Sequence, residues 1–382
     1  MMDKMILTNA SVVTPTEMFK GTVVVNKEGI IDEVSQSTSQ VKGAIDCEGD
    51  YLVPGLVELH TDNLEKHFTP RPGVNWPSRS AVMTHDAQIV ASGITTVFDA
   101  LSLGDVVHGS SRLKNLETMI NALKLAEDDK VHRANHFLHL RCEVSYDGVL
   151  ELFDAMVDHP MVHLVSVMDH SPGQRQFVKE EKYREYYQGK YGFSDEQLVE
   201  FIRKQKEASA KYSASARHTI VNRCHLNDIP LASHDDATIS HADEAKENRM
   251  TVAEFPTTVE AAKASHQHGL SVLMGAPNIV RGGSHSGNVA AKELAKEGVL
   301  DILSSDYYPA SMMDAAFKLA TLENDYDMPR AIRTVTETPA KSAGLTDRGA
   351  IEVGKRADLV WVKPAGEHPL IRHVWNQGQR VF

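Results

Sequence analysis

Eight short apolar runs of strand length alternate with amphipathic segments between residues 52 and 320. Between the runs, apolar residues recur every three or four positions, for example from Leu113 to Leu123 and from Val149 to Val157, which is typical of helices. Eight strands that alternate with helices predict an α/β fold of the closed (β/α)8 type, a TIM-like barrel. The predicted strands are 52–59, 94–98, 137–144, 161–168, 229–233, 250–255, 270–274 and 300–304.

The two chain ends have a different pattern. Residues 5–34 and 349–362 contain short β runs separated by polar turns rather than alternating strands and helices. Because both ends carry such runs, we expect them to pair outside the barrel. The sequence therefore predicts a small β-sandwich domain from residues 1–51 and 346–382, and a barrel over residues 52–345.

The segment of residues 173–227 is too long to be a single connection between two neighbouring strands. Ser194 followed by Asp195 and Glu196 predicts the start of a long helix, because an N-terminal turn favours a serine cap and acidic side chains. The segment is interpreted as the helix after the fourth strand plus an insertion beside the barrel mouth. A solvated surface excursion is the alternative, since long loops need not be functional.

The composition narrows the class of partner. The chain has 382 residues, 42% of them hydrophobic and 24% charged, which suits a soluble globular enzyme. Neither a signal peptide nor an apolar run of about 18 residues is present, so we expect a cytoplasmic protein. The formal net charge of -12 argues against nucleic acid or an anionic membrane as partner. A small anionic substrate stays possible where lysines, arginines or metal ions gather locally.

Potential metal ligands stand at the carboxyl ends of the predicted strands, which is where the chemistry of such barrels lies. Two of them are spaced i, i+2, so they would project from their strand in the same direction. Any one ligand could be a core histidine or a helix cap, but their recurrence on five strands favours a metal centre. Imidazole and carboxylate together suit Zn²⁺, Mn²⁺ or Fe²⁺. The predicted ligands are His60, Asp62, Glu143 (a candidate bridge between two ions), His170, His234 and Asp306, and Asp169, Asp235, Asp236 and Glu254 stand at the same ends.

The loops that follow these strands carry basic and glycine-rich segments. Residues 277–288 resemble an anion cradle, because glycines let backbone N–H groups approach a ligand and polar side chains donate to it. A plain turn is the alternative for this loop. The predicted substrate contacts are Lys66, Arg71, Arg175, Arg281, Ser284, His285 and Asn288.

Several motifs together resemble one enzyme superfamily. The Val53-Pro-Gly-Leu-Val-Glu-Leu-His60 start, Asp306 after the last strand and the tail from Glu337-Thr-Pro-Ala-Lys to Ala357-Asp-Leu-Val resemble the amidohydrolase superfamily over nearly the whole chain. The inner motifs resemble one branch of it, which hydrolyses ribose 1-methylphosphonate 5-triphosphate in the carbon–phosphorus lyase pathway of bacteria. These motifs are residues 60–67, 169–176, 234–238, 254–258, 275–288 and 304–309.

The resemblance implies a metal-dependent diphosphatase. Pyrophosphate would leave, and the 5-phosphate ester would remain for the step that breaks the carbon–phosphorus bond. The resemblance implies two divalent ions, Zn²⁺ or Mn²⁺, that neutralise phosphate charge and activate a water for attack on the α-phosphorus. Asp306 would accept the proton of that water as general base. Relatives commonly assemble, so we also expect a homo-oligomer.

The chain departs from the wider superfamily at three places. Where the superfamily usually has His-x-His, this chain has His60-Thr-Asp62. The usual lysine after the fourth strand is absent, so Glu143 would take its place as the bridge. The sixth strand ends without the usual histidine, which leaves His170 to complete the second ion site. Two other functions remain open. A cyclic amide or N-acyl amino acid hydrolase would need one carboxylate-binding arginine, whereas the predicted mouth has several. A non-catalytic scaffold would have lost its metal ligands.

Overall fold

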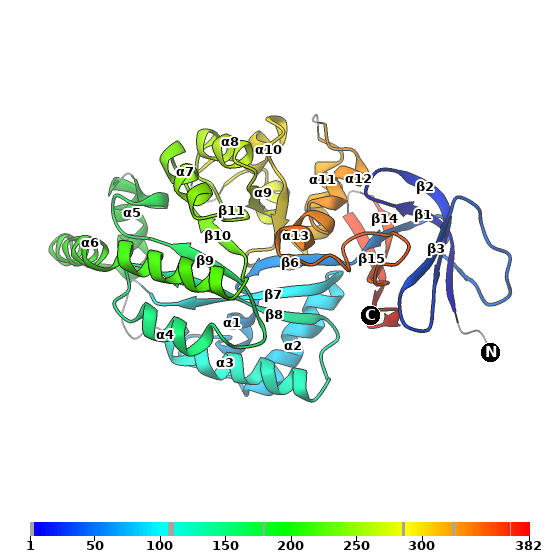
Figure 1. The fold of residues 1–382 in the computed structure, drawn as a ribbon, viewed down its shortest axis with the longest axis horizontal. Coiled ribbons are helices and arrows are strands. Elements are labelled where there is room, and N and C mark those ends of the chain that lie inside the picture. The colour runs from blue at the N-terminus through cyan, green and yellow to red at the C-terminus, as the bar shows by residue number, and fades with distance from the viewer. Residues whose placement is uncertain (1–3, 106–110, 179, 285–286, 323–324, 367) are drawn as a thin grey trace. The chain divides into compact units, whose positions relative to one another are not determined.

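The computed structural model describes residues 4–105, 111–178, 180–284, 287–322, 325–366 and 368–382 (Figure 1). Its contacts divide the chain into two compact units. Unit 1 comprises Met1–Asp99, Asn121–Phe137 and Met274–Phe382, and unit 2 comprises Ala100–Ile120 and Leu138–Leu273.

One sheet is built from both chain ends and lies wholly in unit 1. Its order is β16-β15-β14-β5-β1-β2-β3, with β4 beside β1. The two ends meet where β5 pairs antiparallel with β14, Pro54 opposite Leu359. This confirms a separate sheet from the chain ends, while the exact domain limits stay a prediction. The strands are β1 (Met5–Val13), β2 (Met18–Val25), β3 (Ile31–Ser35), β4 (Ile45–Asp46), β5 (Tyr51–Pro54), β14 (Leu359–Ala365), β15 (His368–Asn376) and β16 (Gln379–Arg380).

The second sheet has eight strands in the order in which they occur along the chain, from β6 to β13. Strand β6 pairs parallel with β7, and β8 to β12 pair parallel with one another in order. Thr61 at the end of β6 also forms a parallel bridge with Asp306 just after β13. The first and last strands therefore meet, and the (β/α)8 prediction is confirmed. The strands are β6 (Leu56–Thr61), β7 (Ile94–Leu103), β8 (Asn135–Glu143), β9 (Val162–Met168), β10 (Leu231–His234), β11 (Val252–Glu254), β12 (Ser271–Gly275) and β13 (Ile302–Ser304).

The prediction of one strand over residues 52–59 is wrong in one respect. The structure divides this run at Gly55 into β5, which belongs to the end sheet, and β6, which opens the barrel. A Cβ at Gly55 would lie 2.2 Å from Thr95 Oγ1, so only glycine lets the chain pass β7 at this point. A continuous apolar run cannot reveal such a change of sheet, since both halves are buried.

Helices connect the barrel strands. None of those in the described part of the chain is long and apolar enough to cross a membrane. The helices are α1 (Asn63–Phe68), α2 (Ser78–Ala91), α3 (Ser111–Asp128), α4 (Val149–Met156), η1 (Arg175–Phe177), α5 (Glu180–Tyr191), α6 (Asp195–Leu226), α7 (Ile239–Glu247), α8 (Val259–Gln267), α9 (Ala276–Arg281), α10 (Ala291–Lys296), α11 (Ser311–Leu319), α12 (Met328–Arg333) and α13 (Glu337–Ser342).

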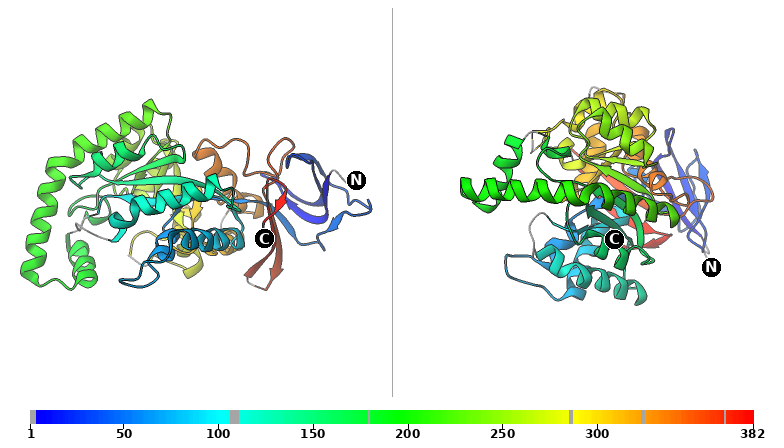
Figure 2. Two further views of the ribbon diagram at one scale, coloured as in Figure 1. Left: turned by 90° about the horizontal axis from the view of Figure 1, so that it is seen from below. Right: turned by 60° about the vertical axis from the view of Figure 1, so that its left-hand side comes forward.

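The insertion of unit 2 is a pair of helices, α5 and α6, that contact each other (Figure 1 and Figure 2). Ser194 caps α6 through a capping box with Gln197, as the sequence predicts. The pair has its own aromatic core, in which the rings of Tyr183 and Tyr187 lie 4.3 Å apart. Burial raises the pKa of both phenols, and the charge of Glu143 adds to the increase, so α5 lies near that carboxylate. The insertion is therefore a packed element rather than a solvated excursion.

Candidate metal centre and substrate loops

Three potential metal ligands come together in unit 2, at the ends of β9 and β10. The ligand atoms of His170, His234 and Asp235 all lie within 4.8 Å of one another. Both imidazoles present Nε2 to the same carboxylate oxygen, Asp235 Oδ2, at 3.5 Å from His170 and 3.6 Å from His234. Two imidazoles and one carboxylate are a ligand set that suits Zn²⁺ or Mn²⁺.

The other nitrogen of each imidazole is held by a glutamate. His170 Nδ1 lies 2.6 Å from Glu143 Oε2, and His234 Nδ1 lies 3.0 Å from Glu254 Oε2. Ligating histidines usually donate Nδ1–H to a carboxylate in this way, which fixes the ring and leaves Nε2 for the ion. The donor set of the cluster therefore fits a divalent metal ion.

Glu143 has further contacts that define its place. Its Oε1 accepts hydrogen bonds from the Ser145 hydroxyl at 2.6 Å and from the His170 backbone N–H at 3.2 Å. The side chain is almost completely buried. In this arrangement Glu143 orients His170, whereas the sequence suggests it as a bridging ligand, and the bridging role stays a prediction.

The surroundings of His170 favour its protonated form. Burial alone would lower the pKa of His170, but the charges of Glu143 and Asp235 outweigh burial and raise it to about 10. Burial would also raise the pKa of Asp235, but the neighbouring His234 and His170 side chains bring it below its ordinary value. The two flanking carboxylates therefore favour the protonated form of His170.

Metal binding should release this proton. We expect Zn²⁺ or Mn²⁺ binding at pH 8 to release about one proton from His170, because an ion needs the neutral imidazole. Calorimetric titration in two buffers of different ionisation enthalpy measures the release. The His218→Gln variant, which changes an exposed histidine on α6, should keep it, and His170→Gln should lose it. Binding to the wild type without proton release would contradict the assignment.

Unit 1 holds the other predicted ligands, His60, Asp62 and Asp306. The Asp306 N–H donates to the His60 carbonyl at 3.0 Å, and the Asp62 N–H donates to the Asp306 carbonyl at 2.7 Å. The ends of β6 and β13 are joined further by buried Glu58, which accepts from the Ser304 hydroxyl at 2.6 Å. The structure therefore brings the backbones of these three residues together.

Two aspartates at the strand ends have left-handed backbone conformations. Asp235 has φ +56° and Asp306 has φ +57°. Such conformations cost roughly 1–2 kcal/mol for residues other than glycine, and aspartate and asparagine tolerate them best. Strain of this kind is often found at functional sites, where it aims a side chain that regular strand geometry would direct elsewhere.

Lys66 is the predicted substrate contact nearest to these ligands. It lies on α1, near enough to Asp62 and Asp306 for both charges to raise its pKa, although burial lowers the pKa more. Its ammonium donates to the Tyr307 carbonyl and lies 5.6 Å from the centroid of the Tyr307 ring. A cation is therefore held beside Asp306.

The glycine-rich loop after β12 also belongs to unit 1. The short helix α9 ends at exposed Arg281, and Gly282 follows in a left-handed conformation with φ +84°. Ser284 and Asn288 are partly exposed, as a ligand cradle requires, and His285 lies outside the described residues. Arg71, in the loop after α1, is exposed as well. Their substrate contacts stay predictions.

Arg175 is placed differently from the other predicted contacts. Its side chain is buried, and its guanidinium donates to the carboxylates of Asp236 and Glu244. Glu244 also accepts from Arg217 at 2.6 Å. This ion-pair network ties the loop after β9 to α7, so Arg175 stabilises the segment that follows His170.

Asp235 and Glu254 are absent from the ligand set predicted from the sequence. Their positions in the sequence could have identified both residues as part of the site, because Asp235 follows His234 directly and Glu254 ends the next strand. In the structure Asp235 contributes a candidate ligand atom and Glu254 orients His234.

Comparison with known proteins shows the family of the chain. Residues 87–382 match the model of the Amidohydrolase family. The chain belongs to the amidohydrolase family.

One curated relative matches over the whole chain. The chain is 54% identical over 379 residues to the alpha-D-ribose 1-methylphosphonate 5-triphosphate diphosphatase of Escherichia coli (strain K12), with 99% of this chain and 100% of the relative covered. Solved structures give the same fold. The 5-methylcytosine deaminase of Klebsiella pneumoniae has a TM-score of 0.64 at 16% identity, covering 99% of this chain and 98% of that one. The N-acetyl-D-glucosamine-6-phosphate deacetylase of Mycobacterium smegmatis has a TM-score of 0.61 at 16% identity, covering 99% of both chains.

Proposed function

We propose that this amidohydrolase hydrolyses alpha-D-ribose 1-methylphosphonate 5-triphosphate to the 5-phosphate ester and pyrophosphate. The observation that carries the proposal is the 54% identity with a diphosphatase of that name, which extends over 99% of this chain and leaves no part of the relative uncovered. The motifs within the barrel that resemble the phosphonate diphosphatase branch, from residues 60–67 to residues 304–309, support the same reaction. We place the reaction in phosphonate catabolism, and a cytoplasmic location and a homo-oligomer stay predictions.

We further propose two sites for divalent ions, Zn²⁺ or Mn²⁺. One uses the unit 2 cluster of His170, His234 and Asp235, with Glu143 and Glu254 orienting the imidazoles. The other uses His60, Asp62 and Asp306 of unit 1. When bound, the ions would neutralise phosphoryl oxygens and lower the pKa of a bound water.

The side chains of the protein supply the remaining requirements of phosphoryl transfer, which are positioning and charge compensation. We propose that the Asp306 carboxylate accepts the proton of the attacking water. Lys66 would hold a phosphate oxygen beside that carboxylate, since its ammonium is kept there by Tyr307. The other proposed substrate contacts are Arg71, Arg281, Ser284, His285 and Asn288.

The Arg281→Ala variant tests the proposed cradle. We expect kcat/KM to fall by about 10- to 100-fold, because a hydrogen bond to a charged group contributes roughly 1.5–3 kcal/mol. Metal content should not change, since Arg281 is not a ligand. The matched control is Arg79→Ala, which changes a surface arginine on α2 that is paired with Asp129 and should retain wild-type kinetics. Normal turnover by Arg281→Ala would remove the cradle from the proposal.

A substrate panel separates the proposed reaction from its rivals. The metal-loaded protein is given the ribose methylphosphonate triphosphate, ATP, dihydroorotate and an N-acyl amino acid in parallel. We expect kcat/KM to be highest for the first compound, with ATP slower. Turnover confined to dihydroorotate or the N-acyl amino acid would favour amide hydrolysis. No turnover and no bound metal would favour a non-catalytic scaffold.

A further inference from the structure

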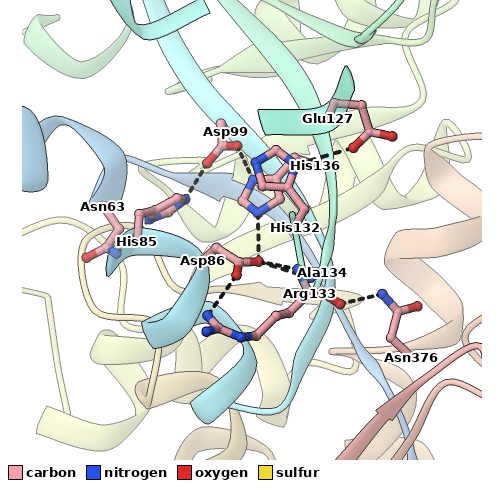
Figure 3. A network of polar contacts seen from close by, with 10 residues as sticks. All are labelled: Asn63, His85, Asp86, Asp99, Glu127, His132, Arg133, Ala134, His136 and Asn376. Atoms are coloured by element: carbon pink, nitrogen blue, oxygen red, sulfur yellow. Dashed lines mark hydrogen bonds and ion pairs between the residues drawn. The ribbon is translucent and has the colours of Figure 1, made fainter. Parts of the chain in front are cut away.

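A buried polar network lies in unit 1 next to the proposed ligand Asp62 (Figure 3). It comprises Asn63 on α1, His85 and Asp86 on α2, Asp99 on β7 and His136 on β8. These side chains are between 0% and 4% exposed. Burying several ionisable groups is costly unless they satisfy one another. The mechanism proposed above uses none of them.

The contacts form a continuous chain. Asn63 Nδ2 lies 2.9 Å from His85 Nδ1, and His85 Nε2 lies 2.7 Å from Asp99 Oδ1. The other Asp99 oxygen lies 2.7 Å from His136 Nδ1, and His136 Nε2 lies 3.4 Å from Asp86 Oδ1. Asp86 also accepts from Arg133, through the backbone N–H at 2.9 Å and the guanidinium at 3.1 Å. Figure 3 shows this path from Asn63 to Arg133.

The chemistry of the donors assigns the protons. An amide nitrogen only donates, so His85 Nδ1 accepts from Asn63, and His85 is neutral with its proton on Nε2. His136 faces a carboxylate at each nitrogen, so both nitrogens donate and the ring is a cation. Two carboxylates are thus balanced by the His136 and Arg133 cations. Because His85 Nδ1 can only accept, the Asn63 side chain is held with its Nδ2 toward His85.

Asn63 is what ties this network to the proposed site. It directly follows Asp62, and Gln88 Oε1 on α2 lies 3.1 Å from the same amide nitrogen. The helix α1 that begins here has only six residues, and Asp62, its N-cap, makes no side-chain capping bond. The buried Asn63 amide is therefore a main anchor for the segment that carries Asp62 and Lys66.

We propose that Asn63, His85, Asp99 and His136 are positioning residues for the unit 1 ion site. They act by fixing the start of α1, and with it the Asp62 carboxylate, in the orientation that binds the ion. This inference rests on the proposed function only in assigning Asp62 as a ligand. Supporting partners of this kind typically contribute a factor of 10–100 to metal affinity.

The cluster could serve a different purpose, because the ligand atoms of His85, Asp99 and His136 also lie within 4.8 Å of one another. Both Asp99 oxygens and both His136 nitrogens already take part in hydrogen bonds, which favours the positioning role over a third ion site. The experiment therefore has to distinguish the two.

Metal affinity, measured by chelator competition, is the decisive readout. We expect Asn63→Ala to bind one of its two ions on the order of 10- to 100-fold more weakly, with kcat recovering at high metal concentration. Asn63→Ser serves as the milder variant if Asn63→Ala does not fold. The matched control is Asn376→Ala, at the outer end of the same network, where the amide donates to the Arg133 carbonyl at 2.7 Å. It should keep wild-type affinity for both ions.

Three outcomes would overturn the proposal. Unchanged metal affinity in folded Asn63 variants, with only a lower Tm, would make the network purely structural. Loss of an ion in His136→Gln but not in Asn63→Ala would make the cluster an ion site itself. Histidine nitrogen NMR of the wild type that shows a neutral His136 would break the proton assignment. Failure of the proposed reaction would leave all three readouts intact, so the two failures are distinguishable.

Discussion

The Asp306→Asn variant should lose kcat by a factor on the order of 10³, because general-base catalysis typically contributes about 10²–10⁴ and an amide cannot accept the proton. The substitution tests chemistry rather than folding. Asparagine tolerates a left-handed backbone as aspartate does, so the φ of +57° at this position is retained. Steady-state kinetics with the metal-loaded protein measures the loss.

The control for this variant lies on the same segment. Asp301 precedes β13, at the opposite end of the strand from Asp306, and Asp301→Asn should keep activity within a factor of about two, as expected of a residue remote from the chemistry. Metal analysis of Asp306→Asn separates loss of the base from loss of an ion. Near wild-type kcat in Asp306→Asn would exclude the proposed base.

The second large effect is expected for His234→Ala. We expect the protein to lose the ion of the unit 2 cluster, because Nε2 of His234 is one of its three proposed ligand atoms and Glu254 holds the ring in place. The charge stabilisation supplied by one ion amounts to several kcal/mol, so kcat/KM should fall on the order of 10³-fold. Elemental analysis after dialysis, together with kinetics, measures both effects.

A surface histidine provides the comparison. His268 at the end of α8 is paired with the Asp243 carboxylate at 2.7 Å, so it resembles His234 in having a carboxylate partner, but it lies outside the cluster. His268→Ala should keep both ions and full activity. If His234→Ala also keeps both ions, the unit 2 cluster is not a metal centre.

Much of the fold is predictable because it depends on local periodicity. Seven of the eight apolar runs correspond to barrel strands, and the first divides between β5 of the end sheet and β6 of the barrel. Ser194 caps α6 as its sequence indicates. The break at Gly55 is not predictable from local periodicity, because it depends on a close approach to Thr95, forty residues later in the chain. The pairing of β5 with β14 is a long-range contact too, but similar patterns at both ends allow it to be expected.

The site is less predictable because ligand direction depends on backbone geometry. Alternation along a strand would turn Asp235 away from His234, but its φ of +56° brings the Asp235 carboxylate to 3.6 Å from His234 Nε2. Arg175 illustrates a second limit. Its partners Asp236 and Glu244 are 61 and 69 residues away in the sequence, so the ion pairs cannot be recognised from the sequence alone. From the sequence, an arginine in ion pairs is therefore indistinguishable from one that binds substrate.

Hydrolysis in ¹⁸O-labelled water, followed by phosphorus NMR, tests the central claim most directly. The metal-loaded protein is incubated with ribose 1-methylphosphonate 5-triphosphate, and the isotope shift locates the phosphorus that received the water oxygen. We predict pyrophosphate without label and a 5-phosphate ester that carries it, which places the attack on the α-phosphorus. Labelled orthophosphate as the first product, or no phosphorus product at all, would contradict the proposed diphosphatase.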